Sequence, residues 1–202
     1  DFHQMIVDPE VKAVFLVTGG YGVSRIIDKI SYPLIEDNPK IIWGFSDVTT
    51  LHTQVNEFAN LVTFHGPMLS SPKGELDPLS KKMFQQLFQP IEIQYTESIS
   101  PLTTIIPGAV RGELTGGNLN RIVSTLGTKF EIDVRNKILL LEDLGETIEQ
   151  IDLMLNQLRL SRKLELAAGF VIADFNMPDD TYSYEDVLKV IEGYLKPFNK
   201  PA

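Results

Sequence analysis

The sequence predicts an α/β protein whose first region is built on a parallel sheet. Apolar runs of strand length at 11–17, 40–43 and 61–64 alternate with helical patterns. This alternation at βαβ spacing indicates right-handed crossovers between parallel strands. A stretch at 69–77 has the composition of a linker, and a second, mixed α/β region follows it. The expected architecture is a flavodoxin- or Rossmann-like N-terminal region joined to this second region.

The same pattern divides the chain into three segments. Residues 1–70 are predicted to form the N-terminal α/β domain, 71–100 a connection, and 101–202 the C-terminal domain. Local patterns predict further elements: helices at 23–30, 78–87, 119–126 and 148–160, and strands at 91–95, 103–110 and 137–141. The helix at 148–160 carries an apolar stripe that is expected in the core.

Composition excludes several classes of protein. Hydrophobic residues make up 43% of the 202 residues, and no apolar run approaches the length of a membrane span. Eighteen basic against 27 acidic residues give a net charge of −9, which opposes binding to nucleic acid or an anionic membrane. The lack of cysteine excludes disulfides and thiolate chemistry. The three histidines are scattered without acids at ligand spacing, so no metal or cofactor is expected.

The most informative feature is a corner between a strand and a helix. The apolar strand at 40–43 ends in the sequence GFSD, and a helical pattern begins at once. A serine at such a corner lies where α/β proteins bind ligands, and the helix N-terminus favours an oxyanion. The order resembles the nucleophile elbow G-x-S-x-G, although Val48 replaces the last glycine. Ser46 is therefore a candidate nucleophile, and the alternative is a plain turn with Ser46 or Asp47 as N-cap.

A glycine-rich loop follows the first strand. Residues 18–22 read TGGYG, and three glycines in four residues let backbone N–H groups approach a bound group. Gly19 and Gly20 are candidates for a second oxyanion donor beside the Asp47 amide. Two alternatives stay open. One is a phosphate site, although the loop matches neither G-x-G-x-x-G nor G-x-x-x-x-G-K-[ST], and the other is a turn without a ligand.

A pair of acids ends the strand at 137–141. Glu142 and Asp143 follow its apolar run, so the strand delivers carboxylates to its C-terminal end. Glu142 is the acid expected to orient a catalytic histidine. In the other interpretation these acids and Glu146 cap the helix at 148–160, because acids in a first turn suit the helix dipole. That interpretation is favoured for Asp143 and Glu146.

Six blocks of sequence occur in an order that is specific to one family. They read DPEVKAVFLVTGGYGVSRIID, YPLIEDNPKIIWGFSDVTTL, LVTFHGPM, RGELTGGNLNRIVSTLGT, KILLLEDLGETIEQIDLMLNQLRL and AAGFVIADF. On these blocks the chain resembles the L,D-carboxypeptidase family of serine peptidases, which is related to the microcin-immunity peptidases. The resemblance covers nearly the whole chain.

The resemblance implies a Ser-His-Glu triad with Ser46 as nucleophile and Glu142 as acid. It implies an oxyanion hole formed by backbone at Gly19, Gly20 and Asp47. The substrate would be a murein tetrapeptide, from which the enzyme releases the terminal D-alanine during peptidoglycan recycling in the cytoplasm. A homodimer is the form typical of the family.

Three side chains are expected to contact the substrate: Tyr21, Asn118 and His65. Asn118 follows Gly116 and Gly117, which are predicted to form a loop that exposes backbone to the peptide. The alternative for this segment is a loop in which Asn118 serves only as the N-cap of the next helix.

The chain departs from the family pattern in two places. Thr18 stands where the family usually has arginine before the glycine loop. The family's triad histidine lies after the helix that corresponds to 184–195, and no histidine occurs there in this sequence. The 202 residues are therefore expected to be an internal portion of a longer protein, and to lack peptidase activity on their own.

The three histidines that are present are the candidates for a substitute base. His52 lies roughly 9 Å beyond Ser46 along the same helix, so a structural role is expected. His3 precedes the first strand without an evident route to the corner. His65 ends the apolar run at 61–64 and is expected to take a supporting or turn role, because a base must lie within hydrogen-bond reach of its nucleophile.

Two alternative functions remain open at this stage. One is an immunity-type serine peptidase that cleaves peptide-nucleotide conjugates. The other is a peptide- or sugar-binding domain that keeps the fold without catalysis.

Overall fold

The computed structural model describes residues 1–70, 78–89, 92, 94–178 and 181–202. Within these residues the fold is α/β, with two three-stranded sheets that are parallel throughout. The first sheet has the order β1-β2-β3, formed by Ala13–Phe15, Ile41–Gly44 and Phe64–His65. The second has the order β4-β5-β6, formed by Leu114–Asn118, Ile138–Leu144 and Gly169–Asn176.

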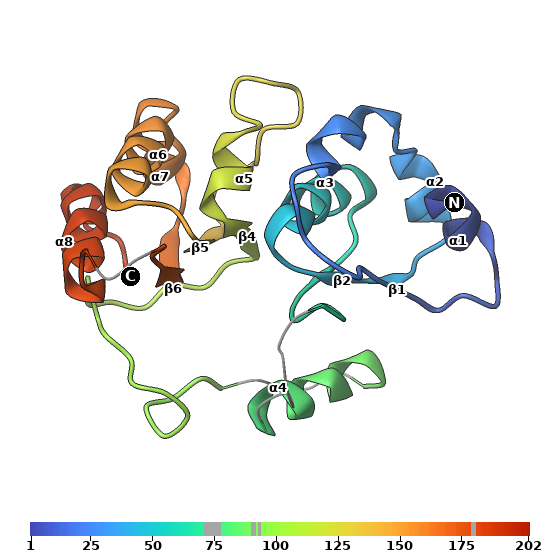
Figure 1. Ribbon diagram of the computed structural model, residues 1–202, viewed down its shortest axis with the longest axis horizontal. Coiled ribbons are helices and arrows are strands. Elements are labelled where there is room, and N and C mark those ends of the chain that lie inside the picture. Colours follow the sequence, from blue (N-terminus) through green and yellow to red (C-terminus); the bar gives the residue numbers. More distant parts are fainter. Residues whose placement is uncertain (71–77, 90–91, 93, 179–180) are drawn as a thin grey trace.

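Helices cover the sheets mainly from one side. Figure 1 shows α3, α5 and α6 above the strands and α4 below them. The helices are α1 (Phe2–Val7), α2 (Tyr32–Asp37), α3 (Thr49–Ala59), α4 (Pro78–Met83), α5 (Leu119–Val123), α6 (Ile148–Leu160), α7 (Lys163–Leu166) and α8 (Tyr184–Leu195). None of the described helices is long and apolar enough to cross a membrane.

Each sheet has its own hydrophobic core. The first core joins α1, α2 and α3 to the strands through residues such as Ile6, Ile42 and Val55, all fully buried. The second is larger and includes Leu141 and Leu155, with α6 and α8 packed together over β5 and β6. Most apolar contacts lie within one region, but Phe130 of the second region packs against the first core and meets the Phe58 ring edge-on.

The polar contacts between the two regions form a seam along α3. The Asn118 amide donates to Thr49 Oγ1 at 3.0 Å, and the Gln54 side chain donates to the Phe130 carbonyl at 2.7 Å. Gly117 lies against the same helix, because a Cβ at this position would meet Thr49 Oγ1 at 2.6 Å. The seam therefore requires a residue without a side chain where β4 passes α3.

Several expected elements are confirmed. The helix at 148–160 has the predicted bounds and begins with a capping box between Thr147 and Gln150. The helix expected over 78–87 forms as α4 followed by a 3-10 turn over Phe84–Leu87. Residues 71–77 of the linker expected at 69–77, and part of the strand expected at 91–95, lie outside the described residues.

Two element predictions are wrong. The segment 23–30 forms two 3-10 turns, Val23–Arg25 and Ile27–Lys29, instead of an α-helix. Its β-branched Val and Ile residues restrict side-chain rotamers in a helix, which lowers helix propensity. The segment 103–110 forms no strand, and Pro107 within it lacks the N–H that a strand ladder needs.

The glycine pair at 116–117 also differs from the expected loop. Both glycines lie inside strand β4, with φ of 123° and 134°. Gly116 pairs with Leu140 and Gly117 with Leu141 on β5. Positive φ in a strand is accessible to glycine because it has no Cβ, so a glycine pair here marks a distorted strand.

Candidate active site

Ser46 occupies a strained turn at the end of β2. Its φ is 62°, in the left-handed region that L-residues other than glycine rarely adopt. A 3-10 turn over Ser46–Val48 connects it directly to α3. Neither Ser46 nor Asp47 caps a helix through its side chain, so the capping alternative is wrong. Because backbone strain of this kind is concentrated at functional sites, the turn indicates a functional serine.

The glycine loop after β1 lies against this serine. A Cβ at Gly19 would be 3.1 Å from both Cβ and Oγ of Ser46. Gly20 has a φ of 146°, which again favours glycine. The loop and the corner, 27 residues apart in sequence, are therefore neighbours because β1 and β2 are adjacent parallel strands. The backbone donors at Gly19, Gly20 and Asp47 stay a prediction for the oxyanion hole.

Gly19→Ala is expected to lower turnover of a Ser46-dependent reaction by roughly 10- to 100-fold, because the new Cβ forces the Ser46 side chain to shift. Gly22→Ala is the matched control in the same loop, since a Cβ there meets nothing within 4 Å and its φ is −92°. Steady-state kinetics and thermal unfolding of both variants check this. Equal turnover in the two variants would contradict it.

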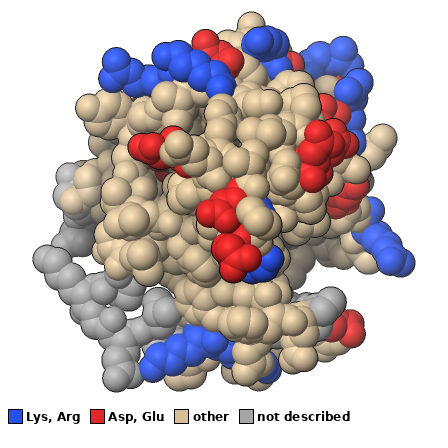
Figure 2. Space-filling view, turned by 90° about the vertical axis from the view of Figure 1, so that its right-hand side faces the viewer, with Lys and Arg blue, Asp and Glu red and all other residues tan. Residues whose placement is uncertain are grey.

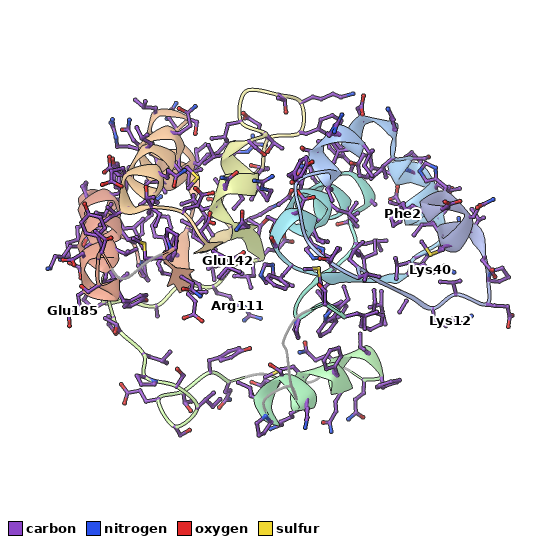
Figure 3. The ribbon with its side chains drawn as sticks, viewed as in Figure 1. Phe2, Lys12, Lys40, Arg111, Glu142 and Glu185 are labelled. Atoms are coloured by element: carbon purple, nitrogen blue, oxygen red, sulfur yellow. The ribbon has the colours of Figure 1, made fainter. Side chains whose placement is uncertain are left out.

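Glu142 is a buried acid in β5, in the region on the other side of the seam from Ser46. It pairs in register with Asn118 on the neighbouring strand, and Figure 3 shows it near the middle of the molecule, between the two sheets. Its Oε1 is buried without a hydrogen-bond partner among the described residues. Burial, together with the nearby Asp143 carboxyl, raises the pKa of Glu142 to about 7. Such a carboxyl can accept a hydrogen bond from an imidazole N–H.

His65 lies close to this acid. It ends β3, and its Nε2 is 3.8 Å from Glu142 Oε1. Partial burial lowers the pKa of the His65 imidazole, and 28% of its side chain stays exposed. The structure thus brings together two residues that the sequence placed on different strands. Substrate contact by His65 stays a prediction.

The other two histidines are engaged elsewhere. His52 is buried in α3, and its Nε2 bonds to the Gly44 carbonyl at 2.8 Å. Burial lowers the pKa of His52 to about 4, so this histidine is neutral at physiological pH. His3 accepts a hydrogen bond from the Ser31 amide at 3.0 Å. The structural role expected for His52 is confirmed.

Asn118 connects strand β4 to α5 and to the acids of β5. Its side-chain oxygen accepts from the Arg121 amide at 3.1 Å, which confirms it as an N-cap. Its side-chain amide donates to Asp143 Oδ1 at 3.2 Å. Asn118 is 5% exposed, whereas the Tyr21 side chain is 73% exposed and free to meet a ligand. Their contact with substrate stays a prediction.

Asp143 and Glu146 do not cap α6, contrary to expectation. Asp143 lies within β5 and accepts hydrogen bonds from the Asn118 side chain and from the Asn120 and Leu144 amides. Glu146 accepts from the Asn120 side chain at 2.5 Å. Thr147 caps the helix instead, because its hydroxyl reaches the third helical amide.

Three residues of the site were missed by sequence reasoning: Thr49, Asn120 and Arg121. Thr49 holds β4 through the Asn118 amide, and the Asn120 amide donates to Asp143 Oδ2 at 2.9 Å. Arg121 lies 3.6 Å from Asp47 and so joins α5 to the serine corner. The polar run NLNR after the glycine pair was a signal for the last two.

No group of three potential ligands in the described part of the chain is arranged for a metal ion. A pocket of about 380 Å³ lies at the far edge of the second sheet, lined by residues such as Ile106 and Phe170. Neither Ser46 nor Glu142 lines it, so it is separate from the candidate site.

The site and fold together define a class of protein. A serine on a strained strand-to-helix turn of a parallel sheet, with a glycine loop and a buried acid nearby, is typical of serine hydrolases. The chain matches the LD-carboxypeptidase N-terminal domain over residues 1–66 and the LD-carboxypeptidase C-terminal domain over residues 111–202. It therefore belongs to the LD-carboxypeptidase family, as the sequence resemblance indicated.

Individual relatives agree with this assignment. The chain is 48% identical over 206 residues to a probable murein peptide carboxypeptidase of Bacillus subtilis, covering 100% of the chain and 65% of that protein. It is 34% identical over 175 residues to a putative carboxypeptidase of Streptomyces coelicolor, covering 83% of the chain and 54% of that protein. The chain thus spans between half and two thirds of the length of these relatives.

Solved structures share the fold. An MccF-like protein from Bacillus anthracis has a TM-score of 0.84 at 27% identity, covering 100% of this chain and 68% of that one. A muramoyltetrapeptide carboxypeptidase from Oxalobacter formigenes has a TM-score of 0.76 at 25% identity, covering 95% of this chain and 68% of that one.

Proposed function

We propose that this chain carries the nucleophile and the acid of a serine L,D-carboxypeptidase that releases the terminal D-alanine of murein tetrapeptides. The observation that carries the proposal is the strained Ser46 turn, held against Gly19 of the glycine loop. The 48% identity to a probable murein peptide carboxypeptidase supports the substrate class. The reaction is acyl transfer: Ser46 first displaces D-alanine from the peptide carbonyl, and water then hydrolyses the acyl-serine.

Each residue has a role in this reaction. Ser46 Oγ attacks the carbonyl carbon and becomes acylated. The amides at Gly19, Gly20 and Asp47 stabilise the oxyanion of the tetrahedral intermediate. Glu142 accepts an N–H from the general-base histidine and fixes its tautomer. The free Oε1 of Glu142 supports this role, because a buried acceptor is stabilised by a donor.

The proposal assigns the role of general base to the histidine that, in the family, follows the helix corresponding to α8. His52 is excluded as the base because its Nε2 is bonded to the Gly44 carbonyl. The resemblance to the family also supports a cytoplasmic homodimer that acts in peptidoglycan recycling. Light scattering of the purified protein measures the oligomeric part of this proposal.

The test uses a chimera in which these 202 residues replace the matching part of the Bacillus subtilis relative. We expect the chimera to release D-alanine from a murein tetrapeptide, and Ser46→Ala to lower this rate by at least about 10⁴-fold. Ser124→Ala, which changes an exposed serine at the C-cap of α5, is the matched control and is expected to retain the rate. Release that is unchanged by Ser46→Ala would overturn the proposal.

The second candidate is an immunity-type peptidase that cleaves peptide-nucleotide conjugates. It is favoured by the 24% identity to the microcin C7 self-immunity protein MccF of Escherichia coli, over 98% of this chain. Competition between a tetrapeptide and an aminoacyl sulfamoyl nucleoside separates the two candidates. Binding of a peptide or sugar without cleavage, unaffected by Ser46→Ala, would instead favour a non-catalytic domain.

A further inference from the structure

The carboxylate of Asp47 makes contacts that its expected backbone role does not require. The side chain is buried, with 3% of the residue exposed. Oδ2 accepts a hydrogen bond from the Val23 amide at 3.0 Å. Oδ1 lies 3.6 Å from the Arg121 guanidinium, at the start of the second region. One carboxylate of the serine corner therefore contacts two other elements, the end of the glycine loop and helix α5.

The Val23 contact fixes the end of the glycine loop. Val23 comes directly after Gly22, the last residue of that loop. On the other side of the loop, the chain that leads into it is held to β2, because the Leu16 amide donates to the Trp43 carbonyl at 2.9 Å. Both acceptors, Trp43 and Asp47, belong to the segment that carries Ser46, so the residues on either side of the loop are bonded to the chain that presents the nucleophile.

We propose that the Asp47 carboxylate is a positioning residue, which holds the glycine loop against Ser46 so that the loop amides face the developing oxyanion. The catalytic part of this inference rests on the proposed function. The physical reason is that oxyanion donors act through fixed geometry, and a displacement of about 1 Å can cost roughly 100-fold in rate. Glycines allow the backbone to approach the serine, but they add no rigidity, so the loop requires an external anchor.

Arg121 extends the same arrangement to the acid. Its guanidinium also donates to Asn120 Oδ1 at 2.8 Å, and the Asn120 amide donates to Asp143 Oδ2 at 2.9 Å. Asp143 is adjacent to Glu142 on β5. The Asp47 carboxylate is thus linked, through the Arg121 side chain and through Asn120, to Asp143 on the strand that carries the acid. It joins the nucleophile half of the site to the other half.

Amide hydrogen exchange of the 202-residue chain tests the positioning without any need for turnover. Asp47→Ala is expected to raise the exchange rate of the Val23 amide at least about 10-fold, because its acceptor is lost. Asp47→Asn keeps an acceptor oxygen and is expected to give a smaller increase. Glu131→Gln is the matched control, since it removes another ion pair, Lys163–Glu131 at 3.1 Å, and leaves Val23 unaffected.

Kinetics of the chimera test the consequence for catalysis. Asp47→Ala is expected to lower kcat by roughly 100-fold with KM changed less than about threefold, and Asp47→Asn to recover part of kcat. Glu131→Gln is expected to keep kcat. Unchanged Val23 exchange in Asp47→Ala, or an equal rise at amides throughout the chain, would overturn the positioning role. If Asp47→Ala raises the Val23 exchange rate but the wild-type chimera shows no turnover, the positioning role stands and only the proposed function is contradicted.

Discussion

Replacing Glu142 by glutamine is expected to stabilise the fold by about 3 kcal/mol above pH 7 and to have little effect near pH 4. Burial raises the pKa of Glu142 to about 7 in the folded chain, from an ordinary value of 4.5. Between these two pH values the unfolded chain ionises its carboxyl and the folded chain does not. Wild-type stability therefore falls as the pH rises from 4.5 to 7, and the neutral amide removes this loss.

Urea unfolding of wild type and Glu142→Gln from pH 4 to 8 measures this difference. Glu131→Gln is the matched control, because its pKa shift has the opposite sign. Hydrogen bonds from the Gly127 amide and from Lys163 lower the pKa of Glu131. Wild type gains stability from Glu131 as the pH rises towards the ordinary glutamate value of 4.5, so the glutamine variant is expected to be less stable than wild type above that pH. A constant difference between Glu142→Gln and wild type at every pH would show that Glu142 is not desolvated.

The same substitution is expected to lower kcat of the chimera by roughly 10⁴-fold, because an amide in place of the acid favours the wrong histidine tautomer. Stability and activity would then change in opposite directions in one variant. D-alanine release under saturating tetrapeptide measures the activity. A variant that is stabilised and keeps its full rate would show that Glu142 is buried for a reason other than catalysis.

Gly116→Ala is expected to destabilise the second region by at least about 4 kcal/mol. A Cβ at this position would lie 2.1 Å from the Leu140 carbonyl oxygen, which is backbone of the paired strand. The backbone cannot rotate away as a side chain can, so β4 must separate from β5. The φ of 123° adds strain for any residue with a Cβ.

Gly127→Ala separates the steric clash with the Leu140 carbonyl from the backbone strain of a positive φ. Gly127 also has a positive φ, 78°, but a Cβ there would meet no atom within 4 Å. It is expected to cost only about 1 kcal/mol, from backbone strain alone. Chemical denaturation, or failure of the Gly116 variant to accumulate as folded protein, reports the difference. Equal stability of the two variants would contradict the close approach of β4 to the Leu140 carbonyl.

Local sequence was sufficient to predict an element whose stability comes mainly from its own residues. The helix at 148–160 has an apolar stripe and a capping box, so its bounds could be predicted from adjacent residues. The segment 103–110 has strand-like composition but lacks a continuous partner, because a strand requires neighbours that distant sequence supplies. The glycine pair at 116–117 looked like a loop for the same reason: its positive φ values are compatible with a strand only beside β5.

In the candidate site, too, some features follow from local sequence and others depend on contacts between distant residues. Ser46, the glycine loop and Glu142 each follow an apolar strand, and this local pattern identified them. The contacts between the two regions were not predictable, since they join residues such as Thr49 and Asn118, 69 positions apart. The Asp47–Arg121 pair belongs to this second group. A sequence pattern shows which groups reach the edge of a sheet, and the packing of two sheets decides which of them meet.

The turn that holds Ser46 also limits which amino acid can serve as nucleophile there. A φ of 62° is least accessible to β-branched side chains, because their second γ atom collides with the backbone. Threonine, although chemically a hydroxyl nucleophile, is therefore disfavoured at position 46 by conformation. Cysteine has no such branch and fits the same backbone. Evolution of this corner towards new chemistry is thus open to a thiol and closed to a secondary alcohol.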